Sequence, residues 1–124
     1  MDIIISNSSG KPIYEQIVLQ IKEGIITGRL RPGEALPSMR NLAMQLRISI
    51  ITTKRAYEEL EKEGFIESFT GKGSFVKAQD PELLREEGLR QTESLLVQAV
   101  EKAKQSGISQ EELTELVKIL YEGE

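Results

Sequence analysis

The sequence of 124 residues contains no cysteine and no histidine. It therefore has no disulfide, no thiolate nucleophile and no imidazole base, and it lacks the side chains that hold most zinc and haem sites. Only carboxylates, hydroxyls and lysines remain for catalysis, and no nucleophile with a neighbouring base is recognisable among them. We therefore predict that the chain is not an enzyme and that it uses no cofactor or metal.

Long apolar runs are also missing. The N-terminus, MDIIISNSSGKP, has three isoleucines that suit a short strand or a packed arm, but neither the charged start nor the apolar centre of a signal peptide. No segment approaches the roughly 20 apolar residues that span a bilayer. We therefore expect a soluble, cytoplasmic protein. A chain of 124 residues can carry one ordinary domain, or one small domain and an appendage, and its apolar fraction of 39% is enough for a modest packed core.

Acidic residues are absent from one stretch of an otherwise acidic chain. The net charge is −4, yet residues 35–57 contain no Asp or Glu. Residues 1–79 hold 11 Lys and Arg against 9 Asp and Glu, whereas residues 80–124 hold 5 against 11. A local positive surface on an acidic chain indicates a DNA-facing edge, and the asymmetry indicates two parts with different roles. The basic residues of the acid-free stretch are Arg40, Arg47, Lys54 and Arg55.

Apolar residues recur at helical spacing in three segments of the first half. A first helix is predicted from Pro12 to Thr27, closed by Gly28. Ser38 is placed to cap a short second helix, and Ser49 to cap a third. The predicted inward side chains of the second and third helices are Met39, Leu42, Ala43, Leu46, Thr53, Ala56, Tyr57 and Leu60.

A hairpin is predicted directly after the third helix, which ends at Gly64. Residues 65–69 and 74–76 are rich in strand-forming types and flank the turn Thr70-Gly71-Lys72-Gly73. Two helices joined by a tight polar turn and followed by a hairpin form a winged helix-turn-helix. Lys72 suits the tip of the wing, because the glycines beside it let the backbone approach a sugar-phosphate strand closely.

The pattern beyond residue 79 is helical and acidic. An apolar stripe runs from Leu83 to Ala103 with Gly88 as a candidate kink, and Ser109 with Glu112 has the spacing of a capping box for a last short helix. The stripe requires burial, and one small domain offers limited surface to cover it. We favour burial of this stripe against a second copy of the chain; packing of the stripe within the same chain is the alternative.

The start of the third helix suits a recognition helix, whose first residues enter the major groove. Ser49, Ile50, Ile51, Thr52, Lys54 and Arg55 lie there, and the glutamates of this helix are held to its far end. Arg40, in the first turn of the second helix, is placed to reach a base edge or a phosphate. Arginine is the usual bidentate reader of guanine.

Three stretches, LPSMRNLAMQLRIS, AYEELEKEGFIE and GKGSFV, follow one another in this order. They resemble the GntR family of bacterial transcription regulators, with its Leu-Pro-Ser-x-Arg opening and its Gly-x-Gly-x-Phe-Val wing. The resemblance covers residues 12–76 and implies that Arg40, residues 49–54 and the wing glycine Gly71 meet DNA. The complete set of expected DNA-binding residues is Ser38, Arg40, Ser49, Ile50, Ile51, Thr52, Lys54, Arg55, Gly71 and Lys72.

The chain departs from many members of this family at two positions of the third helix. Ile50 stands where they have a polar or basic residue, and Thr53 stands where they have a bulky apolar one. Ile50 is able to contact thymine methyl groups instead. Thr53 bears on how the helix packs.

The short C-terminal part resembles the YtrA-like subfamily, in which short C-terminal helices mediate dimerisation. The resemblance implies a mainly α fold with a β-hairpin wing, a DNA-binding domain over residues 1–78 and a helical dimerisation tail over residues 79–124. It also implies a transcription repressor that binds a palindromic operator as a homodimer. The alternative is a winged helix that docks proteins without binding DNA. The acid-free stretch favours DNA, because protein docking does not require it.

Overall fold

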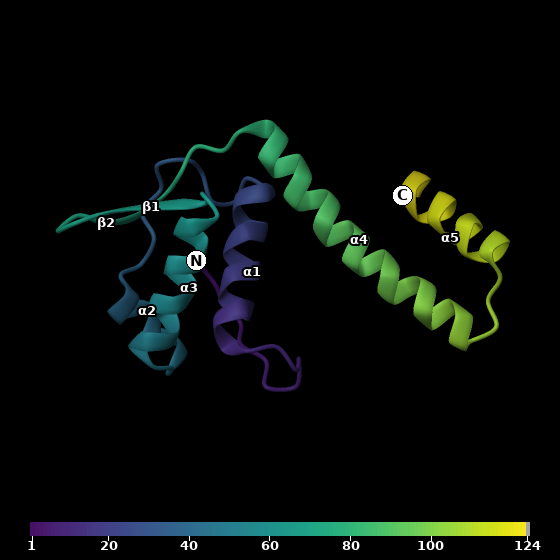
Figure 1. Cartoon of the computed structure of the whole chain (residues 1–124), viewed down its shortest axis with the longest axis horizontal. Helices are drawn as coiled ribbons and strands as arrows, with labels where there is room; N and C mark the ends of the chain where they lie inside the picture. The colour runs from purple at the N-terminus through teal and green to yellow at the C-terminus, as the bar shows by residue number, and fades with distance from the viewer. Residues whose placement is uncertain (124) are drawn as a thin grey trace. The chain divides into compact units, whose positions relative to one another are not determined.

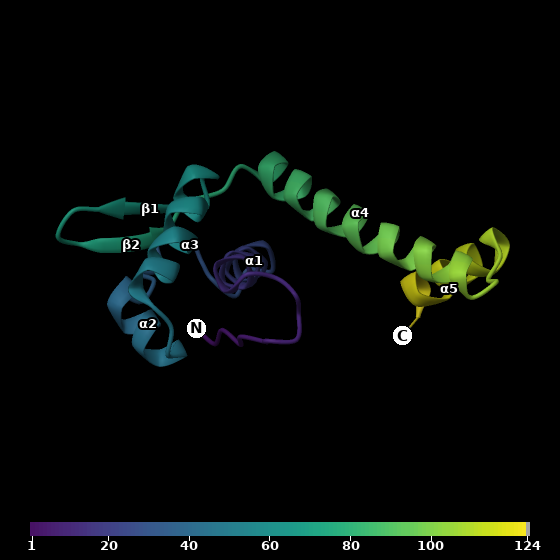
Figure 2. The same cartoon turned by 60° about the horizontal axis from the view of Figure 1, so that its bottom comes forward.

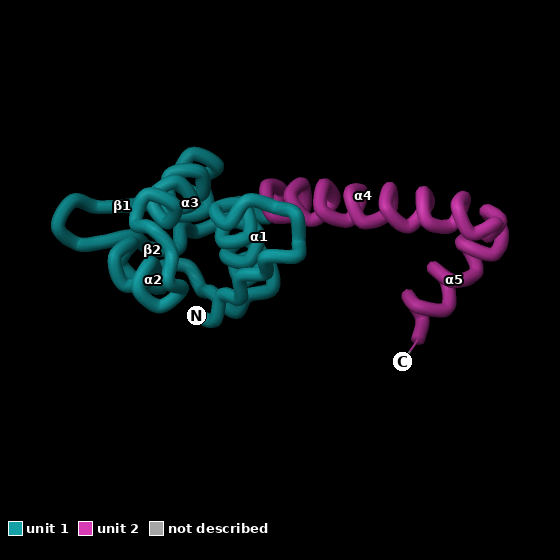
Figure 3. The backbone as a smooth tube through the Cα atoms, turned by 90° about the horizontal axis from the view of Figure 1, so that it is seen from below, with its two compact units in different colours: residues 1–81 teal, residues 82–124 magenta. Residues whose placement is uncertain are grey.

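The computed structural model describes residues 1–123 and places five helices and one antiparallel hairpin in them (Figure 1). The predicted fold class, mainly α with a small hairpin wing, is confirmed. Backbone contacts divide the chain into two compact units, residues 1–81 and residues 82–124 (Figure 3). The elements are α1 (Ile13–Ile26), α2 (Met39–Leu46), α3 (Ile50–Lys62), β1 (Ile66–Phe69), β2 (Gly73–Val76), α4 (Pro81–Gln105) and α5 (Gln110–Glu122).

Helix α3 is the centre of the first unit, because α1 and α2 both pack against it and the hairpin follows it directly (Figure 2). Burial of an aliphatic side chain contributes about 1.5–3 kcal/mol, so the apolar faces of these elements hold the unit together. All the predicted inward residues of α3 are buried, as are Leu42 and Ala43 of α2. The largest fully buried side chains are Tyr57, Ile17, Ile21, Leu42, Leu60, Ile66, Val76 and Thr53.

The predicted caps of α2 and α3 are confirmed. The Ser38 hydroxyl accepts a hydrogen bond from the Asn41 backbone N–H at 3.0 Å, and the Ser49 hydroxyl accepts one from the Thr52 N–H at 3.1 Å. Each serine thereby satisfies one of the backbone donors that a helix start leaves without a partner. The first helix is one residue shorter at each end than predicted, because Pro12 and Thr27 are its caps.

Thr53 occupies the position of α3 at which a bulky apolar residue was expected from the family resemblance. Its side chain is completely buried, and its hydroxyl donates to the Ile50 carbonyl oxygen at 2.8 Å. The same hydroxyl lies 3.3 Å from the carbonyl oxygen of Met39 in α2. The buried oxygen is therefore satisfied by backbone groups, which removes the cost of burying an unpaired hydroxyl.

The hairpin is shifted slightly from the prediction. Gly73, expected in the turn, is the first residue of β2 and pairs with Phe69, and the Lys72 N–H closes the turn by donating to the Phe69 carbonyl oxygen at 2.9 Å. Phe65, expected in the first strand, instead donates its N–H to the Leu60 carbonyl oxygen at the end of α3. The Phe65 N–H therefore ends α3 and is not available for pairing in β1.

A segment before α2 joins the hairpin, which the sequence pattern did not indicate. Ala35 forms an isolated antiparallel bridge with Phe75, and the Leu36 N–H donates to the Ser74 carbonyl oxygen at 2.9 Å. The Val76 N–H donates to the Glu34 carbonyl oxygen, also at 2.9 Å. These bonds fix the hairpin relative to the chain that enters α2.

The N-terminal isoleucine run is an arm that lies along α1. The Ile4 N–H donates to Oε1 of Gln20 at 2.9 Å, and Nε2 of Gln20 donates to the Ile4 carbonyl oxygen at 2.7 Å. A glutamine side chain therefore provides the donor and acceptor that a neighbouring strand would provide. Of the two interpretations, strand or arm, the arm is correct.

The second unit consists of α4 and α5. Helix α4 runs without interruption through Gly88, the candidate kink, so this glycine does not end the helix. Glycine costs a helix about 1 kcal/mol relative to alanine but keeps its N–H, and a long helix absorbs that cost. The capping box of α5 is confirmed. Within residues 1–123, no helix has the length and apolarity needed to cross a membrane.

The capping box predicts a pH effect on α5. The Ser109 N–H donates to Oε1 of Glu112 at 3.0 Å, and this bond, followed by the Ser109 hydroxyl, holds the pKa of Glu112 below its ordinary value of 4.5. The folded helix thus favours the carboxylate. The stabilisation is complete above pH 4.5 and is lost as the pH falls through the lowered pKa. NMR titration of the Glu112 carboxyl should give a pKa below the ordinary value of 4.5; a pKa at or above that value would contradict the assignment.

Candidate nucleic-acid interface

The turn between α2 and α3 depends on one left-handed residue. Arg47 has φ 57° and ψ 47°, and within residues 1–123 it is the sole non-glycine residue with positive φ. The Ile48 N–H donates to the Ala43 carbonyl oxygen at 3.0 Å, which closes α2 behind Arg47. The chain thus changes direction within the three residues between α2 and α3, as a helix-turn-helix requires.

The first turn of α3 presents apolar and basic side chains to solvent. Ile51 is 79% exposed and Ile50 is 48% exposed, and Lys54 is also exposed. The hydroxyls of Ser49 and Thr52 lie 2.8 Å apart and bond to each other, so part of their hydrogen-bonding capacity is used within the helix. Two bare isoleucines at this place suit contacts with thymine methyl groups, since no partner within the described residues covers them.

Arg40 lies in the first turn of α2 and is exposed. The helix that carries it is held by the Ser38 cap and by Tyr57, whose hydroxyl donates to the Pro37 carbonyl oxygen at 2.6 Å. Burial raises the pKa of Tyr57 well above its ordinary value, so the hydroxyl keeps its proton and remains a donor. Tyr57 therefore fixes the chain just before Arg40.

Replacing Tyr57 with phenylalanine tests this contact. We expect Tyr57→Phe to lower the free energy of unfolding by about 1–2 kcal/mol, because the Pro37 carbonyl oxygen loses its donor in a partly buried place. Urea denaturation followed by circular dichroism gives the value. Tyr14→Phe is the matched control, since the Tyr14 hydroxyl makes no hydrogen bond in the described part of the chain. Equal stability of the two variants would show that the bond contributes nothing.

The wing is built from two glycines with positive φ, 78° at Gly71 and 106° at Gly73. Lys72 between them is exposed and its side chain is free of ion pairs within residues 1–123. Phe69 is 50% exposed, and its ring centroid lies 6.1 Å from that of Phe75 on the partner strand. Phe69 was not among the predicted site residues, although an aromatic residue at a strand end beside a glycine turn is a signal for a stiffened hairpin.

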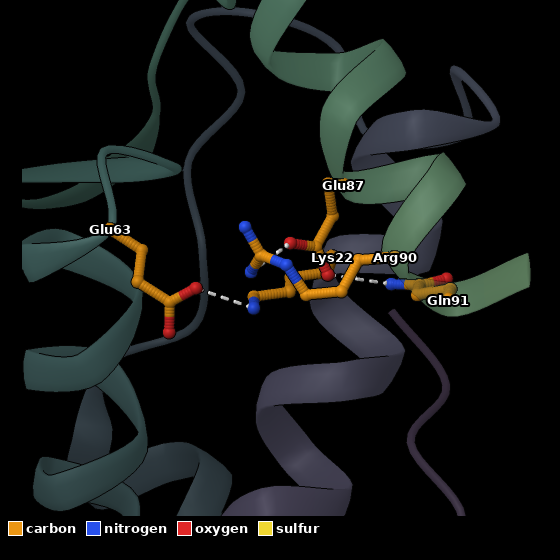
Figure 4. Close-up of polar contacts among 5 residues, drawn as sticks. All are labelled: Lys22, Glu63, Glu87, Arg90 and Gln91. Carbon is orange, nitrogen blue, oxygen red and sulfur yellow. Dashed lines mark hydrogen bonds and ion pairs between the residues drawn. The ribbon is translucent and has the colours of Figure 1, made fainter. Parts of the chain in front are cut away.

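The basic residues of this surface carry charge that no carboxylate of the described residues neutralises. Over the described chain, Arg40, Lys54, Arg55 and Lys72 form no ion pair. Lys22, in contrast, is buried and pairs with Glu63 at 2.5 Å (Figure 4). In the second unit, Arg90 and Gln91 of α4 bond to Glu87 of the same helix. Unpaired cations on α2, α3 and the wing produce the positive potential that attracts a phosphate backbone.

Arg55 differs from the other basic residues in its surroundings. Its guanidinium carbon lies 3.9 Å from the centre of the Tyr14 ring in α1, so the side chain stacks on an aromatic face instead of extending freely. Arg55 was predicted as a DNA-binding residue at the start of α3, but Tyr14 was not among the predicted site residues. Spacing along one helix cannot indicate a contact between two helices.

Comparison with known proteins places this geometry in one family. Residues 13–76 match the model for bacterial regulatory proteins of the gntR family. The chain is 37% identical over 116 residues to the HTH-type transcriptional repressor YtrA of Bacillus subtilis (strain 168), covering 94% of this chain and 89% of that protein. It also resembles a crystal structure of a transcriptional antiterminator from Listeria monocytogenes EGD-e, with a TM-score of 0.74, 32% identity and coverage of 98% and 91%.

A third similarity concerns DNA directly. The structure of the AraR DNA-binding domain in complex with operator ORX1 has a TM-score of 0.54 and 25% identity, covering 61% of this chain and 95% of that one. The family is one of regulators, which confirms the prediction that the chain is not an enzyme and favours DNA binding over the protein-docking alternative. The chain belongs to the GntR family of bacterial regulatory proteins and is a DNA-binding transcription regulator.

Proposed function

We propose that the chain represses transcription by binding a palindromic operator as a homodimer. The observation that carries this proposal is the set of exposed, unpaired basic residues on α2, the start of α3 and the wing. The name of the Bacillus subtilis relative, a transcriptional repressor, supports the direction of regulation. Because an operator is chromosomal DNA, the proposed site of action is the cytoplasm.

Each element of the surface has a distinct proposed role on DNA. Residues 49–54 enter the major groove, where Ile50 and Ile51 contact thymine methyl groups and Lys54 contacts a base or phosphate. Arg40 contacts a base edge next to these residues. The N-terminus of α2, which Ser38 caps, contacts a phosphate. Gly71 and Lys72 approach the sugar-phosphate backbone at the wing.

The proposed dimer forms through residues 79–124, while residues 1–78 bind DNA. Helices α4 and α5 leave apolar side chains exposed in the single chain, a larger set than a soluble monomer normally shows. A second copy is the occupant that we propose, because a palindromic site requires two recognition helices about 34–36 Å apart. The side chains concerned are Leu89, Leu95, Leu96, Val97, Val100, Leu116, Val117, Ile119 and Leu120.

Titration of DNA at several salt concentrations tests the binding part of the proposal. The probe is a duplex that carries the sequence enriched by the protein from a random DNA pool, here termed the selected duplex, and the comparison is a shuffled duplex of the same length. We expect tighter binding to the selected duplex and a steep loss of affinity between about 50 and 200 mM salt, since bound phosphates release counterions. Affinity that is indifferent to salt would contradict a basic DNA-binding surface.

A further inference from the structure

Arg55 and Tyr14 form a cation–π pair between α3 and α1. The guanidinium carbon of Arg55 lies 3.9 Å from the centre of the Tyr14 ring, well inside the roughly 6 Å over which such pairs attract. Arg55 is exposed and Tyr14 is half-buried. The ring therefore restricts a side chain that is otherwise among the most flexible in proteins.

The pair orients the Arg55 charge without neutralising it. Glu58 and Glu59 follow Arg55 by three and four residues, the spacing at which helical ion pairs form. Nevertheless, no carboxylate of the described residues lies within ion-pair distance of Arg55. A stacked guanidinium keeps the N–H groups at its edge free to bind a phosphate.

The place of Arg55 on α3 fits a contact at the edge of the major groove. It follows the highly exposed Ile51 by four residues, so it lies one turn further along and about 40° around the helix axis. Thr53 and Tyr57, on the opposite flank of α3, bond to carbonyl oxygens in and just before α2. Arg55 thus borders the exposed face on the side of α1. Phosphates border a helix that lies in the groove.

We propose that Tyr14 is a positioning residue that holds Arg55 against a DNA backbone phosphate, so that α1 supports the DNA interface from behind. The inference rests on the proposed DNA-binding mode of α3. A phosphate contact carries no sequence information, so the pair should strengthen binding to all DNA equally. Tyr14 itself acts through Arg55 and needs no contact with DNA.

A double-mutant cycle on the full chain tests the proposal with the selected and shuffled duplexes. We expect Arg55→Ala to weaken binding to both duplexes about tenfold and to reduce the salt slope by about one. Tyr14→Leu should weaken both about threefold, and Tyr14→Phe, which keeps the ring, should bind as the wild type does. In the Arg55→Ala background, Tyr14→Leu should have no further effect.

The controls separate this inference from a purely structural role. Arg29→Ala removes an exposed arginine whose side chain bonds only to Thr27 within residues 1–123, and we expect it to leave the salt slope unchanged. Circular dichroism verifies that each variant is folded. The same loss from Tyr14→Leu with and without Arg55, or an unchanged salt slope in Arg55→Ala, would overturn the proposal while the wild type still binds. If the wild type binds neither duplex, the proposed function itself fails.

Discussion

Replacing Arg40 with alanine is expected to weaken binding to the selected duplex by about 1–3 kcal/mol, a factor of roughly 5 to 150. The guanidinium is exposed and unpaired in the described chain, and its helix is held by the Ser38 cap and the Tyr57 hydroxyl. A fixed arginine that makes two bonds to one guanine loses both on truncation, and the base edge is left unpaired. Fluorescence anisotropy with labelled duplexes measures the change.

The comparison of two duplexes separates base reading from a phosphate contact at Arg40. A reader of a base loses affinity for the selected duplex far more than for the shuffled one, which relaxes specificity at one position of the operator. Equal losses on both duplexes would make Arg40 a phosphate contact. No loss beyond that of the Arg29→Ala control would remove Arg40 from the interface.

Charges introduced into the exposed apolar face of α5 are expected to separate the proposed dimer. Leu116 and Leu120 are four residues apart on one side of this helix, with exposed fractions of 47% and 77%. The double variant Leu116→Asp/Leu120→Asp would bury unpaired carboxylates in a seam with a second copy. Because a monomer engages one half-site, affinity for the selected duplex should fall by about 10² to 10⁴.

Analytical ultracentrifugation measures the oligomeric state of the wild type and of the double variant. The wild type should sediment as a dimer at micromolar concentration and the double variant as a monomer. Lys118→Asp is the control, because Lys118 is exposed on the same helix but lies two residues, about 160° around the helix axis, from both Leu116 and Leu120. A monomeric wild type would contradict the proposed dimerisation through residues 79–124. A double variant that remains dimeric would show that Leu116 and Leu120 lie outside the dimer interface.

Local chemistry made much of this fold predictable from the sequence. The caps at Ser38, Ser49 and Ser109 follow from hydrogen bonds that span three residues, and all are present. Helix α4 continues through the candidate kink at Gly88, because a glycine weakens a helix without breaking its hydrogen bonds. The start of β2 at Gly73 was missed since a glycine suits the turn and the last strand pair equally well.

Contacts between distant segments were not predictable in the same way. The Ala35–Phe75 bridge, which fixes the wing relative to α2, requires a segment without strand character to meet a strand. The stacking of Arg55 on Tyr14 depends on how α1 crosses α3, which no spacing along either helix specifies. Sequence patterns indicated which residues form the candidate interface, and tertiary packing determined which of them are held in place.

Selection of bound sequences from a random DNA pool tests whether the chain recognises DNA as a symmetric dimer, because it examines DNA binding, symmetry and spacing together. A homodimer that presents two recognition helices should enrich an inverted repeat, with the centres of its half-sites about one helical turn, roughly 10–10.5 base pairs, or a multiple of that apart. Enrichment of a single asymmetric half-site would contradict the dimeric mode of binding. A pool that remains random after selection would contradict sequence-specific DNA recognition by this chain.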